Sequence, residues 1–264
     1  MILCTAQFDF KSNKNYKRLL NVFVQSVKKY IPEIDIRILR LEMPRKVDNT
    51  PLNFTCNTIK LKAWVDFLGS ETDDIIFSDC DMICSGNPLG VFDQEFDVAY
   101  TSTGLKSPPM NGGMLFVRNN QRSLDFFKSW LSVNNKMYYN DKQLHAQWRA
   151  KYLGMNQAAF GYLINNIPVE AQLLPVPTQI YNAVDTDWKN INDLTCFIHI
   201  KSELRRAVLN NMEPHGVCER AMKLWYEIQA ELPVEQKECS QEPKKPARPT
   251  RYRRVRRRGK IFKI

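Results

Sequence analysis

The chain has 264 residues, of which 44% are hydrophobic and 25% are charged, which is ordinary for a globular protein. This composition excludes a collagen, a coiled coil and a wholly disordered chain. No apolar run reaches the roughly 18 residues that a membrane-spanning helix needs. The N-terminal segment MILCTAQFDF has no basic start, so we expect a strand there and not a signal peptide.

The net charge of +10 belongs to the C-terminal end of the chain. Residues 237–264 contain 12 Lys and Arg against 2 Asp and Glu; subtracting them from the totals of 38 and 28 leaves 26 of each, so residues 1–236 are neutral. From Pro233 onward the sequence is rich in Glu, Lys, Ser, Gln and Pro and then in Arg. We therefore predict one folded domain at residues 1–232 and a flexible basic tail at residues 233–264.

Hydrophobic periodicity predicts strands and helices that alternate through the first half of the chain. The expected strands are Ile2–Phe8, Ile34–Leu41, Asp74–Phe77, Phe96–Thr101, Met114–Val117, Leu173–Pro175 and Phe197–Ile200. The expected helices are Tyr16–Lys29, Thr58–Leu68, Ser123–Leu131, Asn156–Asn165 and Cys218–Leu232. Such alternation predicts an α/β fold, with a mostly parallel sheet and helices on both of its faces.

Two carboxylates follow the third predicted strand. Asp79 and Asp81 are two residues apart, so in an extended segment they project to the same side. Their repulsion favours a cation between them, and the carboxyl end of a strand is where open α/β sheets bind ligands. Hard oxygen ligands suit Mg²⁺ or Mn²⁺. The alternatives are a solvated turn and a haloacid-dehalogenase-type phosphatase; the pair's place in mid-chain, before Met82, disfavours the phosphatase.

Several other segments accompany the acidic pair in a fixed order. They are Thr58–Trp64 (TIKLKAW), Phe77–Asp81 (FSDCD), Asn87–Leu89 (NPL), Met110–Val117 (MNGGMLFV), Asn156-Gln157, Leu174-Pro175 with Tyr181-Asn182, and His199 with Arg205. In this order they resemble the motifs of GT-A nucleotide-sugar glycosyltransferases. The chain looks most like the branch that contains glycogenin and the bacterial lipopolysaccharide galactosyl- and glucosyltransferases. The resemblance spans roughly residues 1–210, and co-occurrence of several motifs is far more specific than any one of them.

The resemblance implies a GT-A, Rossmann-like fold and transfer of glucose or galactose from a nucleoside-diphosphate donor, UDP as the first guess, with retention of configuration. It implies Mn²⁺ or Mg²⁺ as the cofactor, with three metal ligands: Asp79, Asp81 and His199. The residues it places at the nucleotide sugar are Ala6, Lys60, Asp79, Cys80, Asp81, Asn111, Gly112, Gly113, Gln157, Lys201 and Arg205. The residues it places at the reacting sugar as catalytic are Asn111, Asn156 and Gln157.

The chain departs from the family pattern in three ways. Asn156 stands where the family has Asp, and an amide cannot act as a base or a nucleophile. Arg205 stands where the family has Lys, but a guanidinium can grip a diphosphate through two hydrogen bonds. The usual glycine between His199 and Arg205 is missing, so Lys201 is expected to share the phosphate contact.

The basic tail bears on the acceptor. Residues 244–263 suit an anionic partner, and Arg outnumbers Lys by 7 to 5 in residues 237–264, which slightly favours nucleic acid over a membrane surface. The acceptor would then be a hydroxylated base in DNA, as in phage glucosyltransferases that modify DNA. The alternative is a membrane-associated glycan such as lipopolysaccharide, because Tyr252, Ile261 and Phe262 among cations also suit an anionic bilayer.

Other readings of the chain stay open. A solubilising terminus would explain the tail without any partner. A non-catalytic module that binds nucleotide sugars or nucleic acid would explain Asn156. A sugar-1-phosphate nucleotidyltransferase is disfavoured because its Gly-rich loop is absent. With seven cysteines and no export signal, we expect a cytoplasmic protein, free or peripheral to the membrane, in a bacterial or phage-infected cell.

Overall fold

The structure is a computed structural model that describes residues 1–8, 14–44 and 50–233. The predicted tail lies outside the described residues from residue 234 onward, so its flexibility and its anionic partner stay predictions. The boundary between a domain at 1–232 and a tail at 233–264 stays a prediction as well.

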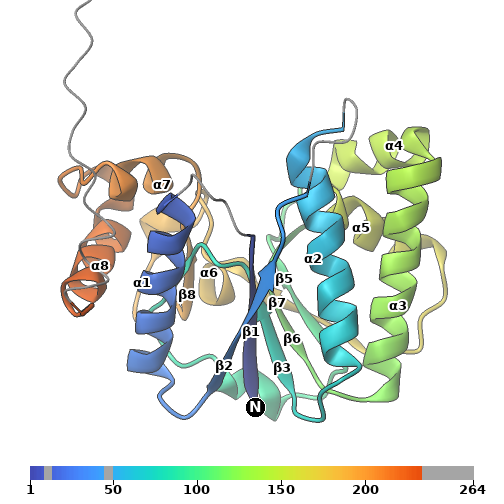
Figure 1. The fold of residues 1–264 in the computed structure, drawn as a ribbon, viewed down its shortest axis with the longest axis horizontal. Coiled ribbons are helices and arrows are strands. Elements are labelled where there is room, and N and C mark those ends of the chain that lie inside the picture. Colours follow the sequence, from blue (N-terminus) through green and yellow to red (C-terminus); the bar gives the residue numbers. More distant parts are fainter. Residues whose placement is uncertain (9–13, 45–49, 234–264) are drawn as a thin grey trace, which may run out of the picture.

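The strands form two separate sheets (Figure 1). They are β1 (Ile2–Phe8), β2 (Asp35–Leu41), β3 (Ile75–Ser78), β4 (Met82–Cys84), β5 (Val98–Ser102), β6 (Met110–Val117), β7 (Leu173–Pro177) and β8 (Phe197–His199). The main sheet has six strands in the order β2-β1-β3-β6-β5-β7, and β4 and β8 pair in the second sheet.

The main sheet is mostly parallel, as the sequence predicted. The pairs β1–β2, β1–β3 and β5–β7 are parallel, whereas β6 is antiparallel to both of its neighbours, β3 and β5. The strands β1, β2, β3, β5 and β7 therefore end at the same edge of the sheet, which is the edge where a parallel sheet places its ligands.

Helices cover both faces of the main sheet, which confirms the predicted α/β layering (Figure 1). They are α1 (Lys14–Tyr30), α2 (Leu52–Leu68), α3 (Gln121–Asn135), α4 (Lys142–Tyr152), α5 (Asn156–Asn166), α6 (Thr178–Tyr181), α7 (Ser202–Leu209) and α8 (Glu219–Ala230). Side chains of α2, α3 and α5 pack on one face, and those of α1 pack on the other. The opposite flank of α1 packs against α7, α8 and the β4–β8 sheet.

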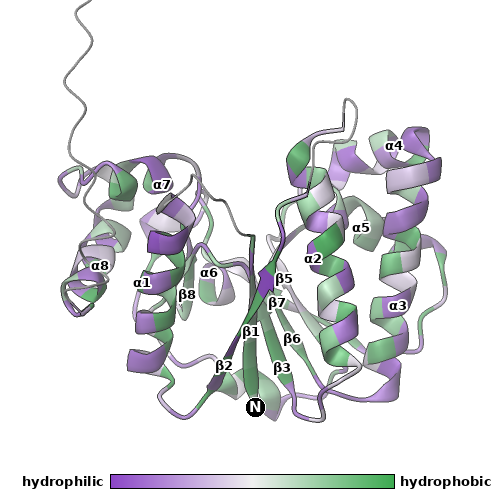
Figure 2. Ribbon diagram, viewed as in Figure 1, coloured by the Kyte–Doolittle hydropathy of each residue, from purple (hydrophilic) through white to green (hydrophobic). Residues whose placement is uncertain are grey.

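The hydropathy of the elements explains these layers. The central strands are hydrophobic along their length, whereas helices such as α1 and α8 carry one hydrophobic and one hydrophilic side (Figure 2). In β3, for example, Ile75 and Phe77 enter the core under α2 and α3, and Ile76 enters the core under α1. Both faces of a buried strand must be apolar, because helices exclude water from each of them.

Two predicted boundaries were wrong in ways that matter for the site. The helix predicted at Thr58–Leu68 begins at Leu52, directly after Pro51, because the chain there is rich in Asn and Thr and carries little helical periodicity. The strand predicted at Met114–Val117 begins at Met110, so Asn111, Gly112 and Gly113 lie within β6 and not in a turn before it.

Sequence periodicity also missed the short elements β4, α6 and α7 and the 11-residue helix α4. A three-residue strand such as β4 offers too few residues to show a period. No helix in the described ranges combines the length and the apolarity that crossing a membrane requires.

Candidate active site

Backbone pairing brings the two carboxylates and the imidazole together from distant parts of the chain. Asp79 follows β3, and its backbone N–H donates a hydrogen bond of 2.9 Å to the carbonyl of Gly113 in β6. Asp81 directly precedes β4, and its carbonyl accepts a hydrogen bond of 2.7 Å from the N–H of Ile200. Because Met82 of β4 pairs with His199 of β8, the imidazole is held beside the acidic pair.

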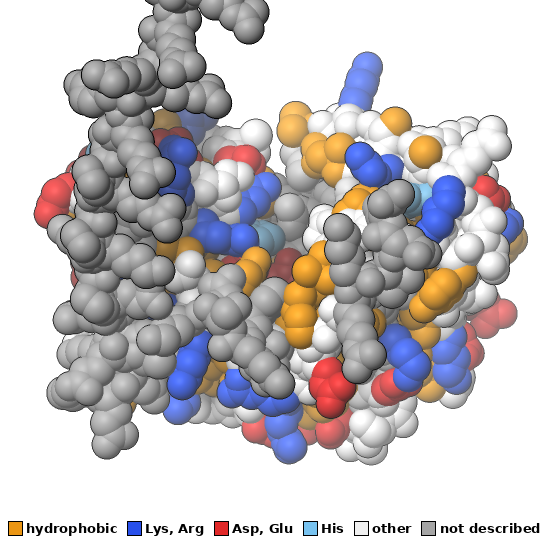
Figure 3. Space-filling view, turned by 45° about the horizontal axis from the view of Figure 1, so that its top comes forward, with side chains coloured by type: hydrophobic (Ala, Val, Ile, Leu, Met, Phe, Trp, Pro, Cys, Tyr) orange, Lys and Arg blue, Asp and Glu red, His pale blue; other side chains and the backbone are white. Residues whose placement is uncertain are grey.

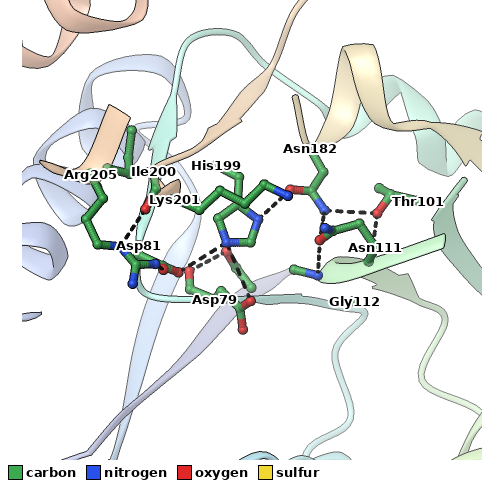
Figure 4. A network of polar contacts seen from close by, with 12 residues as sticks. Asp79, Asp81, Thr101, Asn111, Gly112, Asn182, His199, Ile200, Lys201 and Arg205 are labelled. Atoms are coloured by element: carbon green, nitrogen blue, oxygen red, sulfur yellow. Dashed lines mark hydrogen bonds and ion pairs between the residues drawn. The ribbon is translucent and has the colours of Figure 1, made fainter. Parts of the chain in front are cut away.

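The three side chains form one cluster (Figure 4). Nε2 of His199 lies 3.5 Å from Oδ1 of Asp81 and 3.9 Å from Oδ2 of Asp79, and the candidate ligand atoms of all three lie within 4.8 Å of one another. An ion about 2.1 Å from each ligand holds neighbouring ligands about 3 Å apart, so a small contraction would close this cluster on Mg²⁺ or Mn²⁺. Two carboxylates and one imidazole also fit the chemistry of these ions.

A cation pairs with each carboxylate. Lys60 of α2 forms an ion pair with Asp79, and Arg205 of α7 forms one with Asp81. Burial raises the pKa of the Asp81 carboxyl, but the neighbouring side chains of His199 and Arg205 outweigh burial and lower that pKa from 3.8 to about 2. Asp81 is therefore a carboxylate, ready to bind a cation, at any physiological pH.

The two cations are held in place by further contacts. Arg205 donates through Nε to the carbonyl of Ile200 (2.9 Å) and through Nη1 to the hydroxyl of Tyr16 (3.2 Å). The ammonium of Lys60 lies 4.6 Å from the ring centroid of Trp64. Lys201, which we expected beside Arg205 at the phosphates, instead pairs with Asp185 at 3.2 Å.

A cavity of about 310 Å³ opens beside Asp79 and Asp81. Its floor and walls combine apolar side chains with a few amides, and its lining is Ala6, Phe8, Tyr16, Met43, Leu52, Asn53, Cys56, Asn57, Lys60, Asp79, Cys80 and Asp81. The lining includes Ala6 and Cys80, both predicted at the nucleotide. An apolar cavity with a few polar groups is a suitable site for a nucleobase and a ribose.

A second, smaller cavity of about 90 Å³ lies on the other side of Lys60 and Asp79. Its lining combines charged and amide side chains with two tryptophans, a methionine and two glycines, and consists of Asn57, Lys60, Trp64, Asp79, Gly112, Trp130, Gly154, Met155, Asn156 and Gln157. The two cavities thus share Asn57, Lys60 and Asp79, so a cation and a candidate metal ligand border both of them. Figure 3 shows the surface hollowed between the two halves of the molecule, with Lys and Arg side chains gathered beside the hollow.

A family model for nucleotide-diphospho-sugar transferases matches residues 72–204, a stretch that contains the acidic pair, β6, Gln157 and His199. The chain belongs to this family. It is therefore a glycosyltransferase, and the side chains of Asp79, Asp81 and His199 form a candidate metal site. No curated protein matched the sequence.

Solved structures agree with this family assignment at the level of the fold. A glycosyltransferase involved in glycosylation of the major capsid of PBCV-1 has a TM-score of 0.54 and 13% identity, over 84% of this chain and 100% of that one. The galactosyltransferase LgtC has a TM-score of 0.53 and 12% identity, and the match covers 90% of this chain and 100% of LgtC. The glycosyltransferase GlyE of Streptococcus pneumoniae has a TM-score of 0.53 and 13% identity, and the match covers 90% of this chain and 62% of GlyE. The transferase described here thus has the GT-A fold.

In this transferase, Asn156 and Gln157 begin α5 at the smaller cavity. Asn156 is buried; its Nδ2 donates to the carbonyl of Asn57 (2.9 Å), and its Oδ1 has no hydrogen-bond partner in the described part of the chain. Gln157 accepts at Oε1 from the N–H of Gly112 (3.2 Å) and donates to the carbonyl of Tyr152 (2.7 Å). The free oxygen of Asn156 is thus the polar atom of this pair that is left for a ligand.

The three residues of the Asn-Gly-Gly segment in the transferase make different contacts. Gly112 lines the smaller cavity, where its missing side chain leaves room for Gln157. Gly113 leaves room for the ring of His199. The Oδ1 atom of Asn111, which we predicted at the donor sugar, accepts hydrogen bonds from Gly113 N–H (3.0 Å) and from Asn182 Nδ2 (2.9 Å).

Sequence reasoning missed several residues of the site. Asn57 and Asn53 lie three and seven positions before Lys60 in α2, which puts them on the same helical face, and they line the cavities with it. Helical spacing counted back from Lys60 would have found them if the helix had been extended to Leu52. Asn182 was noticed only as part of a motif, although its amide contacts His199.

Proposed function

We propose that the transferase moves glucose or galactose from a UDP donor to a hydroxyl acceptor, with retention of configuration and with Mn²⁺ or Mg²⁺ held by Asp79, Asp81 and His199. The observation that carries this proposal is the convergence of these three side chains at Asp79, which together with Lys60 lines both cavities. The larger cavity suits the nucleoside and the smaller one suits the sugar, so the diphosphate would lie across the metal site.

The cations of the site have a natural role in this reaction. Negative charge develops on the diphosphate as the glycosidic bond breaks, and fixed positive charge at that point stabilises the transition state. A bound divalent ion would supply part of this charge. Lys60 and Arg205, which pair with the carboxylates, are placed to turn towards the diphosphate, while Lys201 would have to leave Asp185 to join them.

The smaller cavity limits the chemistry at the sugar. Among the described residues that line it, Asp79 is the one carboxylate, and we assign that side chain to the metal. Asn156 and Gln157 are amides, which orient a sugar but do not attack it. We therefore propose that these two residues and Asn111 position the donor sugar, and that the rate acceleration comes mainly from charge stabilisation at the diphosphate.

Donor hydrolysis tests the proposal before any acceptor is known. UDP-glucose and UDP-galactose are incubated with the full-length protein in Mn²⁺, in Mg²⁺ or in EDTA, and released UDP is measured. We expect turnover that requires the metal and that falls to background in Asp81→Ala. The matched control, Asp66→Ala, removes an exposed carboxylate of α2 that pairs with Lys62, and should retain full activity.

Two results would reject the proposal in different ways. Full activity in EDTA would exclude the metal mechanism. Metal-dependent binding of UDP-sugars with no turnover of any donor would favour the alternative of a non-catalytic binding module, to which Asn156 in place of a carboxylate lends support.

For the acceptor, we propose a hydroxylated base in DNA, with the basic tail at residues 244–263 holding the nucleic acid; the alternative is a membrane-associated glycan such as lipopolysaccharide. Either acceptor agrees with a cytoplasmic enzyme. Full-length protein and a variant with Gln at positions 253, 254 and 256–258 are compared for binding to DNA and to anionic vesicles. Salt-sensitive binding to DNA that is lost in the variant supports the proposal, and binding to vesicles alone supports the alternative.

A further inference from the structure

The two nitrogens of the His199 ring face different surroundings (Figure 4). Nε2 points to the carboxylates of Asp79 and Asp81. Nδ1 points away from them and lies 3.2 Å from Oδ1 of Asn182. We infer that Asn182 is a positioning residue that keeps a hydrogen on Nδ1 of His199, so that the lone pair of Nε2 is available to the metal ion. The inference rests on the proposed metal site and adds a residue that acts through His199.

The orientation of the Asn182 amide follows from its neighbours. The backbone N–H of Gly113 donates to the side chain of Asn111 at 3.0 Å, and because an N–H can only donate, the atom of Asn111 that it meets is the oxygen. The same oxygen lies 2.9 Å from the amide of Asn182, so the Asn182 atom there must be the nitrogen. The oxygen of Asn182 is then left to face His199.

Thr101 supports the same orientation from a second direction. Its hydroxyl donates to the backbone carbonyl of Asn111 at 2.6 Å, which leaves its oxygen to accept from Nδ2 of Asn182 at 3.0 Å. Asn182 is fully buried. A reversed amide would place its oxygen against two acceptors and leave buried groups unsatisfied, at a cost of about 1–3 kcal/mol for each group.

The fixed amide selects one form of the ring. A neutral imidazole carries one N–H, and the oxygen of Asn182 can only accept a hydrogen bond, so the hydrogen belongs on Nδ1. Nε2 is then the acceptor that a metal ion requires, and the hydrogen bond at Nδ1 also fixes the rotation of the ring. The backbone of Gly113 thus influences His199 twice: directly, because the ring packs on it, and through Asn111 and Asn182.

Nitrogen NMR of the full-length protein tests this inference without a variant. The ¹⁵N-labelled protein is studied in EDTA, because a metal ion on Nε2 would itself force the hydrogen onto Nδ1. The pH is one at which free imidazole is neutral, and two-bond couplings to the ring protons identify the nitrogen that carries the hydrogen. We expect the hydrogen on Nδ1 of His199. A hydrogen on Nε2, or an equal mixture of the two forms, overturns the inference.

Metal affinity supplies a second readout. Titration with Mn²⁺ alone, followed by electron paramagnetic resonance, compares the wild type with Asn182→Ala and Asn182→Asp. We expect Asn182→Ala to bind Mn²⁺ about 10- to 100-fold more weakly. Asn182→Asp should bind more tightly than Asn182→Ala, because its carboxylate still accepts from Nδ1. The control Asn134→Ala removes another fully buried amide, one that bonds to Thr58, and should leave Mn²⁺ affinity unchanged.

The outcomes separate this inference from the proposed function. A wild type that binds no Mn²⁺ rejects the metal site itself. A wild type that binds Mn²⁺, together with an Asn182→Ala variant that binds it equally well, rejects only the role of Asn182. If Asn182→Ala does not fold, the NMR measurement on the wild type still decides the question.

Discussion

The backbone of Gly113 lies directly against the imidazole of His199: a Cβ at position 113 would stand 2.9 Å from both Cε1 and Nδ1 of the ring. The glycine of β6 and the histidine of β8 belong to different sheets, so this contact joins the main sheet to the small one at the metal site. Any side chain at position 113 must move the ring away from the acidic pair.

We therefore predict that Gly113→Ala weakens Mn²⁺ binding by about tenfold or more, because the ring loses the position from which Nε2 faces Asp79 and Asp81. Isothermal titration with Mn²⁺ measures the effect. Gly90→Ala is the matched control, since the nearest atom to a Cβ there is 3.9 Å away. Equal affinity in Gly113→Ala and the wild type would show that the ring can relocate without loss.

The ion pair between Arg205 and Asp81 predicts that metal and donor bind cooperatively. A metal ion at Asp81 displaces Arg205, and the diphosphate of UDP offers this cation a new partner. Mn²⁺ should bind more tightly when UDP is present, by about tenfold. In Arg205→Gln, Mn²⁺ alone should bind more tightly than to the wild type, and UDP should add less.

Titrations of Mn²⁺ with and without UDP measure this coupling. Arg206→Gln, which removes the exposed neighbouring arginine of α7, serves as the control and should behave as the wild type. A coupling that is undiminished in Arg205→Gln would mean that this side chain does not pass from the carboxylate to the diphosphate.

Asp97 is a buried carboxylate that stabilises the fold away from the site. It accepts hydrogen bonds from Asn120, Arg122 and the backbone N–H of Gln172. Burial raises the pKa of Asp97, but the hydrogen bonds from these three residues outweigh burial and lower it below 3.8. We predict that Asp97→Asn lowers the free energy of unfolding by about 2 kcal/mol at neutral pH.

The pH dependence of this loss follows from the sign of the shift. A carboxyl with a lowered folded-state pKa stabilises the protein fully above its unfolded-state pKa, and the contribution disappears as the pH falls through the folded-state value. The difference between wild type and Asp97→Asn in denaturant unfolding should therefore shrink below about pH 4. The exposed Asp93→Asn variant should unfold like the wild type at any pH. If the difference in unfolding free energy between the wild type and Asp97→Asn did not change with pH, the lowered pKa of Asp97 would be contradicted.

At Gly161 in α5, a change to alanine has opposite effects on helix propensity and on packing. In a helix, alanine is favoured over glycine by about 1 kcal/mol. A Cβ at position 161, however, would stand 2.4 Å from the ring of Tyr152. We predict that Gly161→Ala destabilises the protein by about 1–3 kcal/mol, measured by denaturant unfolding. In a Tyr152→Leu background the clash is relieved, so the same substitution should become neutral or stabilising; equal effects in both backgrounds would reject the packing argument.

Local patterns in the sequence predicted the elements that are long or strongly periodic. The first strand, Ile2–Phe8, was predicted at its observed bounds because all of its side chains except that of Gln7 are apolar or small. The start of α2 was missed because Asn53, Thr55 and Asn57 obscure its helical period. The same error removed Asn53 and Asn57 from the predicted site, since their place on the face of Lys60 depends on the helix reaching them.

The sequence by itself determined the α/β layering, the acidic pair at the end of a strand and, through ordered motifs, the family and the participation of His199. Only the tertiary structure decided which side chains contact these groups. Lys60 pairs with Asp79, Arg205 pairs with Asp81, Asn182 forms a hydrogen bond with His199, and Lys201 pairs with Asp185. The physical reason is that periodicity reports which face of one element is buried. The partners across the site, in contrast, are set by the pairing of β4 with β8 and by the packing of the whole chain.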